Sequence, residues 1–211
     1  MTEKVLNLYA GIGGNRKLWQ DVDVTAVEWD EKIANIYADK YPDDNVIVAD
    51  AHQFLEDNYN DGYDFIWSSP PCQTHSRLHH NLAVKHEGRP DTGRYPDMSL
   101  YQEIILLDKS FSGDWIVENV IPYYDFLIEP QIVNRHAFWS NYQIPDVTIS
   151  GHYILEGVTS KLEKSVGISI QEYDLPSDKY DKRQVLRNCV HPELGKHVFD
   201  SRDCLNDPTE W

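Results

Sequence analysis

Four short apolar runs in the N-terminal third of the chain alternate with segments of helical periodicity. The segments between the runs, at residues 14–20, 31–40 and 52–59, carry apolar residues at helical spacing. Short buried strands joined by crossover helices predict an α/β fold, in which a mostly parallel sheet has helices on both faces. The runs are KVLNLY, VDVTAVEW, NVIVAD and YDFIWSS, at residues 4–9, 22–29, 45–50 and 63–69.

The rest of the chain predicts further elements of the same kind and one irregular segment. Residues 96–111 carry apolar residues at helical spacing after a candidate cap at Asp97. Residues 142–182 are polar and interrupted by Gly, Pro and Ser, and they predict a small excursion from the core. The remaining predicted elements are two strands and a closing helix, at residues 114–120 (DWIVENV), 135–140 (RHAFWS) and 188–199 (NCVHPELGKHVF).

The length of 211 residues predicts a single domain over residues 1–211 with one sizeable core. No apolar run approaches the ~20 residues of a membrane-spanning helix, and residues 1–14 lack the pattern of a signal peptide. The three cysteines are odd in number and far apart, which favours free thiols in a reducing compartment: Cys72, Cys189 and Cys204. We therefore expect a cytoplasmic protein with no membrane partner.

The formal net charge of -16 argues against nonspecific attraction to nucleic acid, because a polyanion is repelled by a net-negative protein. Any such binding must be local. Residues 73–94 hold four basic and two acidic residues together with four histidines, so this window is mildly positive. It predicts either a loop that faces nucleic acid or an ordinary solvated loop.

A glycine-rich turn, LYAGIGGNR, follows the first predicted strand. Gly11, Gly13 and Gly14 allow the backbone to come close to a ligand at a helix N-terminus. Arg16 occupies the third glycine position of the dinucleotide fingerprint, which disfavours a dinucleotide.

The next two predicted strands end in groups that suit an adenosine. A carboxylate at Glu28 can accept both ribose hydroxyls, and the indole of Trp29 offers a flat face to adenine, although a tryptophan is as often a core residue. Asp50 can accept from the adenine amino group, although a single acid at a strand end is more often a helix cap. Together these groups favour S-adenosylmethionine, which has no pyrophosphate.

The fourth predicted strand runs into SPPCQ. Pro70 and Pro71 stiffen the backbone directly before Cys72, as expected for a thiol that is aimed at a ligand. A lone cysteine is usually a small buried hydrophobe, so the motif depends on its context. His75 and His79 are four residues apart but have no third ligand at a recognisable spacing, and no metal site is predicted.

These segments together resemble the cytosine-C5 DNA methyltransferase family, and the small size resembles its compact bacteriophage members. LNLYAGIGG, VEWD and DAHQF resemble the family's three cofactor motifs, SPPCQ its nucleophile loop, ENV its sixth motif and QVLRNCVHPELGKHV its closing motif. The resemblance covers nearly all of residues 5–140 and 184–198. It implies a Rossmann-like fold that transfers a methyl group from S-adenosylmethionine to C5 of a flipped cytosine in double-stranded DNA.

The resemblance also assigns roles to single residues. Cys72 would be the nucleophile that adds to C6, Glu118 would lie beside the base, and Arg135 would come from the eighth motif. The implied cofactor-binding residues are Tyr9, Gly11, Gly13, Gly14, Glu28, Trp29, Asp50, Pro70, Asn188 and Val190. The implied DNA-binding residues are Gln73, Ser76, Arg77 and Arg89.

The chain departs from the family at its recognition region. Ala137 stands at the place of the second arginine of the eighth motif, and the ninth motif is not recognisable. Residues 142–182 occupy the place of a target-recognition domain, so we expect a short recognised context, or a partner protein that supplies more surface. A restriction–modification setting, the same chemistry on RNA, and a catalytically idle cofactor-binding module are the remaining interpretations.

Overall fold

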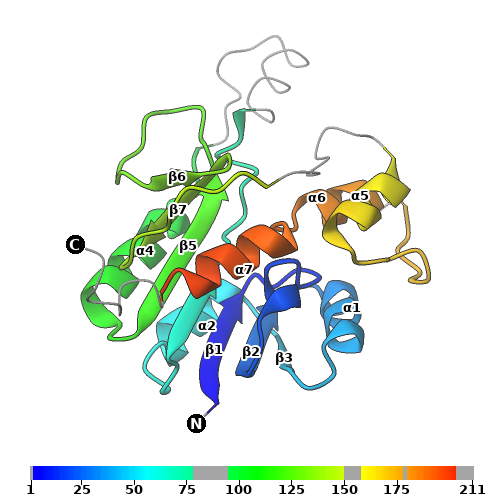
Figure 1. Cartoon of the computed structure of the whole chain (residues 1–211), viewed down its shortest axis with the longest axis horizontal. Helices are drawn as coiled ribbons and strands as arrows, with labels where there is room; N and C mark the ends of the chain where they lie inside the picture. Colours follow the sequence, from blue (N-terminus) through cyan, green and yellow to red (C-terminus); the bar gives the residue numbers. More distant parts are fainter. Residues whose placement is uncertain (1, 78–94, 150–157, 178–179, 203–211) are drawn as a thin grey trace.

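The computed structural model describes residues 2–77, 95–149, 158–177 and 180–202, which form one seven-stranded sheet flanked by helices (Figure 1). The strand order is β3-β2-β1-β4-β5-β7-β6. Strands β1 to β5 pair in parallel, and the β6–β7 hairpin adds antiparallel to β5. The strands are β1 (Glu3–Leu8), β2 (Val22–Glu28), β3 (Asn45–Val48), β4 (Phe65–Ser68), β5 (Asp114–Val120), β6 (Gln131–Val133) and β7 (His136–Ser140).

Helices cover both faces of this sheet because side chains alternate along each strand. Val5 and Phe65 pack on the face of α7 and η1, whereas Leu6 and Ile66 pack on the face of α2 and α4. The predicted α/β class is therefore confirmed. The helices are η1 (a 3-10 turn, Asn15–Leu18), α1 (Glu31–Lys40), α2 (Ala51–Asn58), α4 (Ser99–Ser110), α5 (Thr159–Val166), α6 (Lys182–Arg187) and α7 (Pro192–Asp200).

The described part of the predicted excursion packs against the first half of the chain. Leu162 of α5, the buried Ile170 and Leu186 of α6 form an apolar cluster with Ile12 of the glycine turn and Ile33 of α1. In Figure 1, α5 and α6 lie together at the end of the molecule that also holds α1. The irregular segment is thus joined to the sheet domain through an apolar contact beside the glycine turn.

The ends of three helices differ from the sequence-based prediction. The segment 14–20 forms only the 3-10 turn η1, because Trp19 is already extended. The closing helix begins at Pro192 instead of residue 188, since proline has no N–H and His191 Nδ1 accepts the N–H of Glu193. Helix α4 begins at Ser99 with Met98 at the cap position, although the Asp97 carboxylate still accepts the Ser99 N–H at 3.0 Å.

Three elements escaped the sequence-based prediction: β6, α5 and α6. Strand β6 has three residues, and its turn to β7 is made by Asn134 and Arg135, both with positive φ (54° and 108°). Such a turn favours a two-residue hairpin, but its usual signal is an Asn-Gly pair, which is missing here. Among the residues that the structure describes, no helix is long and apolar enough to cross a membrane.

Candidate active site

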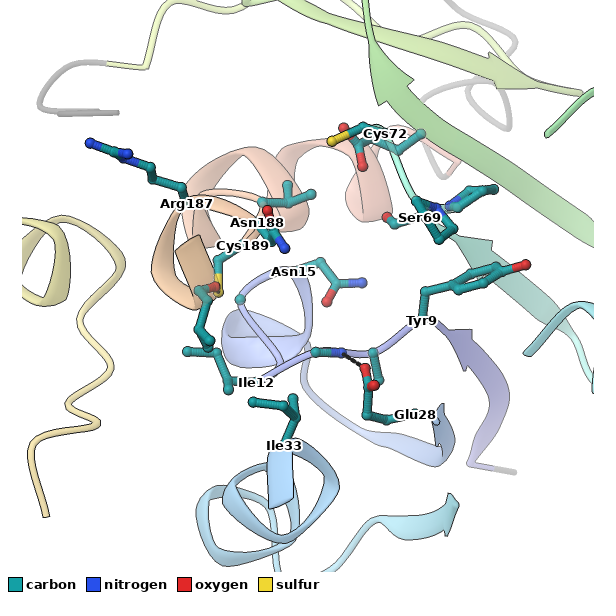
Figure 2. Close-up of a pocket in the computed structure, with 18 of the residues that line it drawn as sticks. Tyr9, Ile12, Asn15, Glu28, Ile33, Ser69, Cys72, Arg187, Asn188 and Cys189 are labelled. Carbon is teal, nitrogen blue, oxygen red and sulfur yellow. Dashed lines mark hydrogen bonds between the residues drawn. The ribbon is translucent and has the colours of Figure 1, made fainter. Parts of the chain in front are cut away.

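A pocket of about 560 Å³ lies at the carboxyl ends of the parallel strands, where ligands bind in folds of this kind. Residues that follow β1, β2 and β4 line it together with the end of β5, and the link between α6 and α7 closes it. Figure 2 shows Cys72 and Glu28 approaching the pocket from opposite sides, with Tyr9 and Ser69 between them.

The glycine turn forms one end of the pocket around Glu28, which is 7% exposed. The two carboxylate oxygens of Glu28 accept the N–H groups of Gly11 and Asp30, each at 3.0 Å. A Cβ on Gly11 would meet nothing within 4 Å, so this backbone faces open space, whereas a Cβ on Gly13 would collide with Tyr41. Burial raises the pKa of Glu28, and hydrogen bonds from the backbone of Asp30, Gly11 and Trp29 partly offset this rise.

Apolar side chains and one exposed indole line the pocket beside Glu28. The indole of Trp29 lies at the rim and is 75% exposed, while Ile33 and Val185 contribute apolar walls. Tyr180 reaches the same rim from the excursion, where its hydroxyl donates to the Asp30 carboxylate at 2.8 Å. A flat, mostly apolar slot of this kind suits an aromatic base.

The link between α6 and α7 closes the opposite wall. Asn188, Cys189 and Val190 line the pocket there, and a Cβ on Gly14 would lie 2.5 Å from the Val190 carbonyl oxygen. Gly14 therefore allows this wall to approach the glycine turn. Burial raises the pKa of the Cys189 thiol to about 12, so this cysteine is protonated at neutral pH.

The loop after β4 presents Cys72, and hydrogen bonds on both sides of it restrict its movement. The Asn119 side chain donates to the Pro70 carbonyl at 2.9 Å, just before the cysteine. After the cysteine, its own carbonyl accepts the N–H groups of His75 and Ser76 at 3.0 and 2.9 Å. The sequence analysis attributed the stiffness to the prolines alone, but the fold adds the contact from Asn119.

The charge of Glu118 reaches Cys72 across the pocket. Burial and, second, the Glu118 charge raise the pKa of the Cys72 thiol to about 11. Glu118 is 8% exposed and accepts a hydrogen bond from His136 Nδ1 to its Oε1 at 2.7 Å. His136 and Asn119 both line the pocket, and the sequence analysis named neither of them.

A buried hydrogen-bond network fixes Tyr9 at the pocket. Its hydroxyl donates to Glu103 Oε1 at 2.6 Å, and the Ser68 hydroxyl and His52 Nδ1 contact the same carboxylate, which is fully buried. Tyr9 itself has a positive φ of 55°. The phenol oxygen is thus held away from the cavity, which leaves the ring as a pocket wall.

The structure brings most of the predicted site residues to this one pocket. Gly13 packs behind the turn, and Asp50 caps α2 by accepting the Gln53 N–H at 2.9 Å, so neither is among the described residues that line the pocket. A contact between Asp50 and adenine stays a prediction. The predicted residues that line the pocket are Tyr9, Gly11, Gly14, Glu28, Trp29, Pro70, Cys72, Gln73, Glu118, Asn188 and Val190.

The two predicted basic residues that the structure describes, Arg77 and Arg135, lie outside the pocket lining. Arg135 occupies the exposed β6–β7 turn, and the next residue, His136, enters the pocket in its place. Arg77 Nε donates to the Pro122 carbonyl at 2.7 Å, beside a backbone bridge between Ser76 and Pro122, so both residues hold the loop in place. Arg89 lies outside the described residues.

Comparison with known proteins places this fold and pocket in a family. The model of the family described as C-5 cytosine-specific DNA methylase matches residues 3–120, more than half of the chain. The chain belongs to this family. The chain is therefore a member of a methyltransferase family whose cofactor is S-adenosylmethionine. A search of curated protein sequences gave no match.

Solved structures of methyltransferases are similar to parts or all of the chain. A SAM-dependent methyltransferase from Agrobacterium tumefaciens is 18% identical with a TM-score of 0.39, over 60% of this chain and 41% of its own. A DNMT2 mutant from Spodoptera frugiperda is 25% identical with a TM-score of 0.37, over 56% of this chain and 35% of its own. The chain thus spans less than half the length of either protein.

A third structure shows the fold over nearly the whole chain. The Entamoeba histolytica methyltransferase EhMeth is 11% identical, with a TM-score of 0.52 over 98% of this chain and 100% of its own. This likeness shows the Rossmann-like methyltransferase fold.

The pocket residues fit the adenosyl part of this cofactor. Each Glu28 oxygen already accepts one backbone N–H and keeps a lone pair for a hydroxyl. Trp29 exposes its ring at the rim, and the backbone at Gly11 is open to the pocket. A carboxylate, a flat aromatic face and an uncrowded backbone are the groups that a ribose and an adenine need.

Proposed function

We propose that the chain methylates C5 of a flipped cytosine in double-stranded DNA, with Cys72 as a covalent nucleophile. One observation carries this proposal: the Cys72 thiol and the Glu118 carboxylate line the same pocket as Glu28 and Gly11. A base beside the thiol would then lie next to the methyl end of a cofactor whose ribose is at Glu28. The family match to a cytosine-specific DNA methylase supports cytosine as the base.

The proposed reaction begins with bond formation between the Cys72 thiolate and C6 of the ring. As this bond forms, the C5–C6 π electrons shift towards C4 and N3, and the proton that the thiol gives up ends on N3, where Glu118 holds it. The cofactor would supply the methyl group, and the electrons of the broken S–CH3 bond would stay on its sulfur as the demethylated cofactor leaves. C5 takes up the methyl carbon, water then takes the C5 proton, and the electrons of the C5–H bond restore the double bond while the C6–S bond breaks and Cys72 regains the proton from N3.

The electrostatics of the pocket favour a Cys72 thiol that loses its proton only after ligands bind. With a pKa of about 11, the Cys72 thiol is protonated at neutral pH while the pocket holds no ligand. A positive charge near the sulfur favours the thiolate and opposes the effect of burial. This arrangement protects the thiol from side reactions before the substrate binds.

The pocket lining also supports the proposed roles in cofactor binding. We assign the ribose to Glu28, the adenine to Trp29 and the methionine end to Tyr9. The remaining residues that we assign to this subsite are Gly11, Gly14, Pro70, Asn188 and Val190.

A covalent trapping experiment tests the proposed function. Duplex DNA that contains 5-fluorocytosine should form a stable adduct with the protein in the presence of cofactor, because fluorine blocks the loss of a proton from C5. Cys72→Ala should give no adduct. The matched control is Cys189→Ala, which removes the second thiol that lines the pocket and should still be trapped. Equal adduct yields from Cys72→Ala and wild type would refute the assignment.

A methyl-transfer assay decides between the alternatives. Incubation of the protein with DNA or with RNA of equal sequence and labelled cofactor shows which polymer takes up the methyl group. A catalytically idle module would bind cofactor and label neither polymer. The presence of Cys72 and Glu118 in one pocket speaks against that alternative.

We place this activity in the cytoplasm, in DNA modification of the restriction–modification or bacteriophage kind. The described part of residues 142–182 packs beside the glycine turn and offers little surface for base contacts. The chain by itself should then recognise a short sequence, unless a partner protein adds recognition surface. The length of the recognised sequence can be measured by mapping methylated cytosines, at single-base resolution, in DNA from cells that express the chain.

A further inference from the structure

His136 and Glu118 face each other on two neighbouring strands. The antiparallel register pairs His136 with Val120 and Phe138 with Glu118, so His136 and Glu118 are diagonal neighbours on one face. His136 Nδ1 lies 2.7 Å from Glu118 Oε1. Their side chains are 14% and 11% exposed, and both line the pocket that holds Cys72.

The direction of this hydrogen bond follows from the groups involved. A carboxylate oxygen accepts hydrogen bonds, which assigns the donated proton to Nδ1 of His136. This hydrogen bond engages one of the two oxygens of Glu118, a residue that lines the pocket. The imidazole ring is itself held, because it stacks on Phe138 with centroids 5.9 Å apart and 27° between the planes.

A glutamate side chain without such a partner can turn about several bonds. A carboxylate that acts on one ring atom needs a fixed direction, since a displacement of about 1 Å costs roughly 100-fold in rate. Asn119, the next residue of β5, already ties the strand to Pro70 of the nucleophile loop. His136 provides the corresponding restraint on the carboxylate itself.

We propose that His136 is a positioning residue, whose Nδ1–H holds Glu118 Oε1 so that Oε2 faces the N3 edge of the flipped cytosine. This inference rests on the proposed function. It gives a role to a histidine that directly follows Arg135, the residue that the sequence analysis placed at the base.

Three variants separate positioning from packing. His136→Leu fills the space without a donor, and His136→Asn keeps a side-chain N–H close to the position of Nδ1. Ile132→Ala, at a side chain of β6 that is 48% exposed, is the matched control. We expect His136→Leu to lower single-turnover methylation about 100-fold, His136→Asn to recover most of this loss, and Ile132→Ala to leave the rate unchanged. Calorimetric affinity for S-adenosylmethionine should stay the same in all three.

A double variant tests whether His136 acts through Glu118. In a Glu118→Gln background, His136→Leu should cost no more than about twofold, because the group that it positions is already gone. A further large loss in the double variant would overturn the proposal, and so would wild-type turnover in His136→Leu. Equal losses in His136→Asn and His136→Leu would also refute it, since only packing would then matter.

A spectroscopic measurement keeps this inference separate from the proposed function. The ¹⁵N shifts of the His136 ring report its tautomer in the ligand-free protein, and we expect a proton on Nδ1, which Glu118→Gln should disturb. A ring protonated only on Nε2 would exclude the proposed hydrogen bond. If wild-type protein forms no adduct with 5-fluorocytosine DNA, the proposed function fails, while the tautomer still decides whether His136 holds Glu118.

Discussion

The sheet half of the molecule and the α5–α6 region contribute to the same pocket in different ways. Strands β1, β2, β4 and β5 deliver Glu28, Cys72 and Glu118 at one edge, because parallel strands end together. The α5–α6 region adds Tyr180 and the apolar wall around Val185. The family match ends at residue 120, so it covers β1 to β5 and none of the α5–α6 region. Under the proposed function, the sheet supplies the catalytic residues and the excursion forms part of the cofactor pocket.

The largest expected effect comes from a substitution that impairs catalysis and leaves cofactor binding unchanged. Glu118→Gln should lower turnover by about 10²- to 10³-fold, because charge stabilisation at the base is lost. S-adenosylmethionine affinity, measured by calorimetry, should not change. The same substitution removes the negative charge near Cys72, so the pKa of the thiol should fall below about 11 and alkylation by iodoacetamide should become faster. A rise in the pKa of Cys72 would show that Glu118 acts on the thiol in another way.

The second effect tests whether the α5–α6 region contributes to cofactor affinity. Ile170→Ala removes a fully buried side chain from the cluster that joins the excursion to Ile12, at a cost of about 3 kcal/mol in the free energy of unfolding of this region. Cofactor affinity should fall, and adduct formation at saturating cofactor should stay near the wild-type rate. Val158→Ala is the control, because Val158 is 52% exposed. Thermal unfolding measures the loss of stability, and calorimetry measures the loss of cofactor affinity.

The third effect distinguishes two strand-end acids within the sheet half. Glu28→Ala should weaken S-adenosylmethionine binding by about 1.5 to 3 kcal/mol for each charged hydrogen bond lost. Asp50→Ser keeps a side-chain oxygen for the Gln53 N–H, so any loss of affinity in this variant measures the predicted contact with adenine, and we expect it to be smaller than in Glu28→Ala. Equal losses in the two variants would mean that Asp50 contributes to binding as much as Glu28 does.

The smallest expected effect is on the pH dependence of stability, through the hydrogen bond between His52 and Glu103, the carboxylate that also holds Tyr9. The hydrogen bond with Glu103 raises the pKa of His52, while partial burial opposes this rise. A raised pKa stabilises the fold fully below the unfolded value near 6.5, and this stabilisation is lost as the pH rises through the folded pKa. The difference in Tm between wild type and His52→Gln should therefore be larger at pH 5.5 than at pH 9. A difference that grows with pH would contradict the assignment.

The sheet half was predictable because its signals are local. Buried strands and amphipathic helices repeat with fixed periods, so the first four strands and α1 follow from the pattern alone. The glycine turn, Glu28 and Cys72 fall at strand ends, and a parallel sheet brings strand ends to one edge. The sequence therefore predicted the sheet and many of the residues that meet in the pocket, although not His136 or Asn119.

The α5–α6 region was not predictable for the opposite reason. Its helices have eight and six residues, which gives too few turns for a clear period. Their apolar side chains are buried only because Ile12, Ile33 and Ile36 lie across from them. Contacts between residues so far apart in the chain leave no pattern within either segment.

The sequence by itself determined the α/β sheet and the glycine turn, since each depends on spacing along one segment, while the family resemblance paired Cys72 with Glu118. Tertiary structure decided that Asp50 caps a helix, that Arg135 stays on an exposed turn and that His136 contacts Glu118. The physical reason is the register of β7 against β5, because a shift of one residue exchanges the faces of every side chain on a strand. Only the folded chain fixes that register, and with it the histidine that reaches the active site.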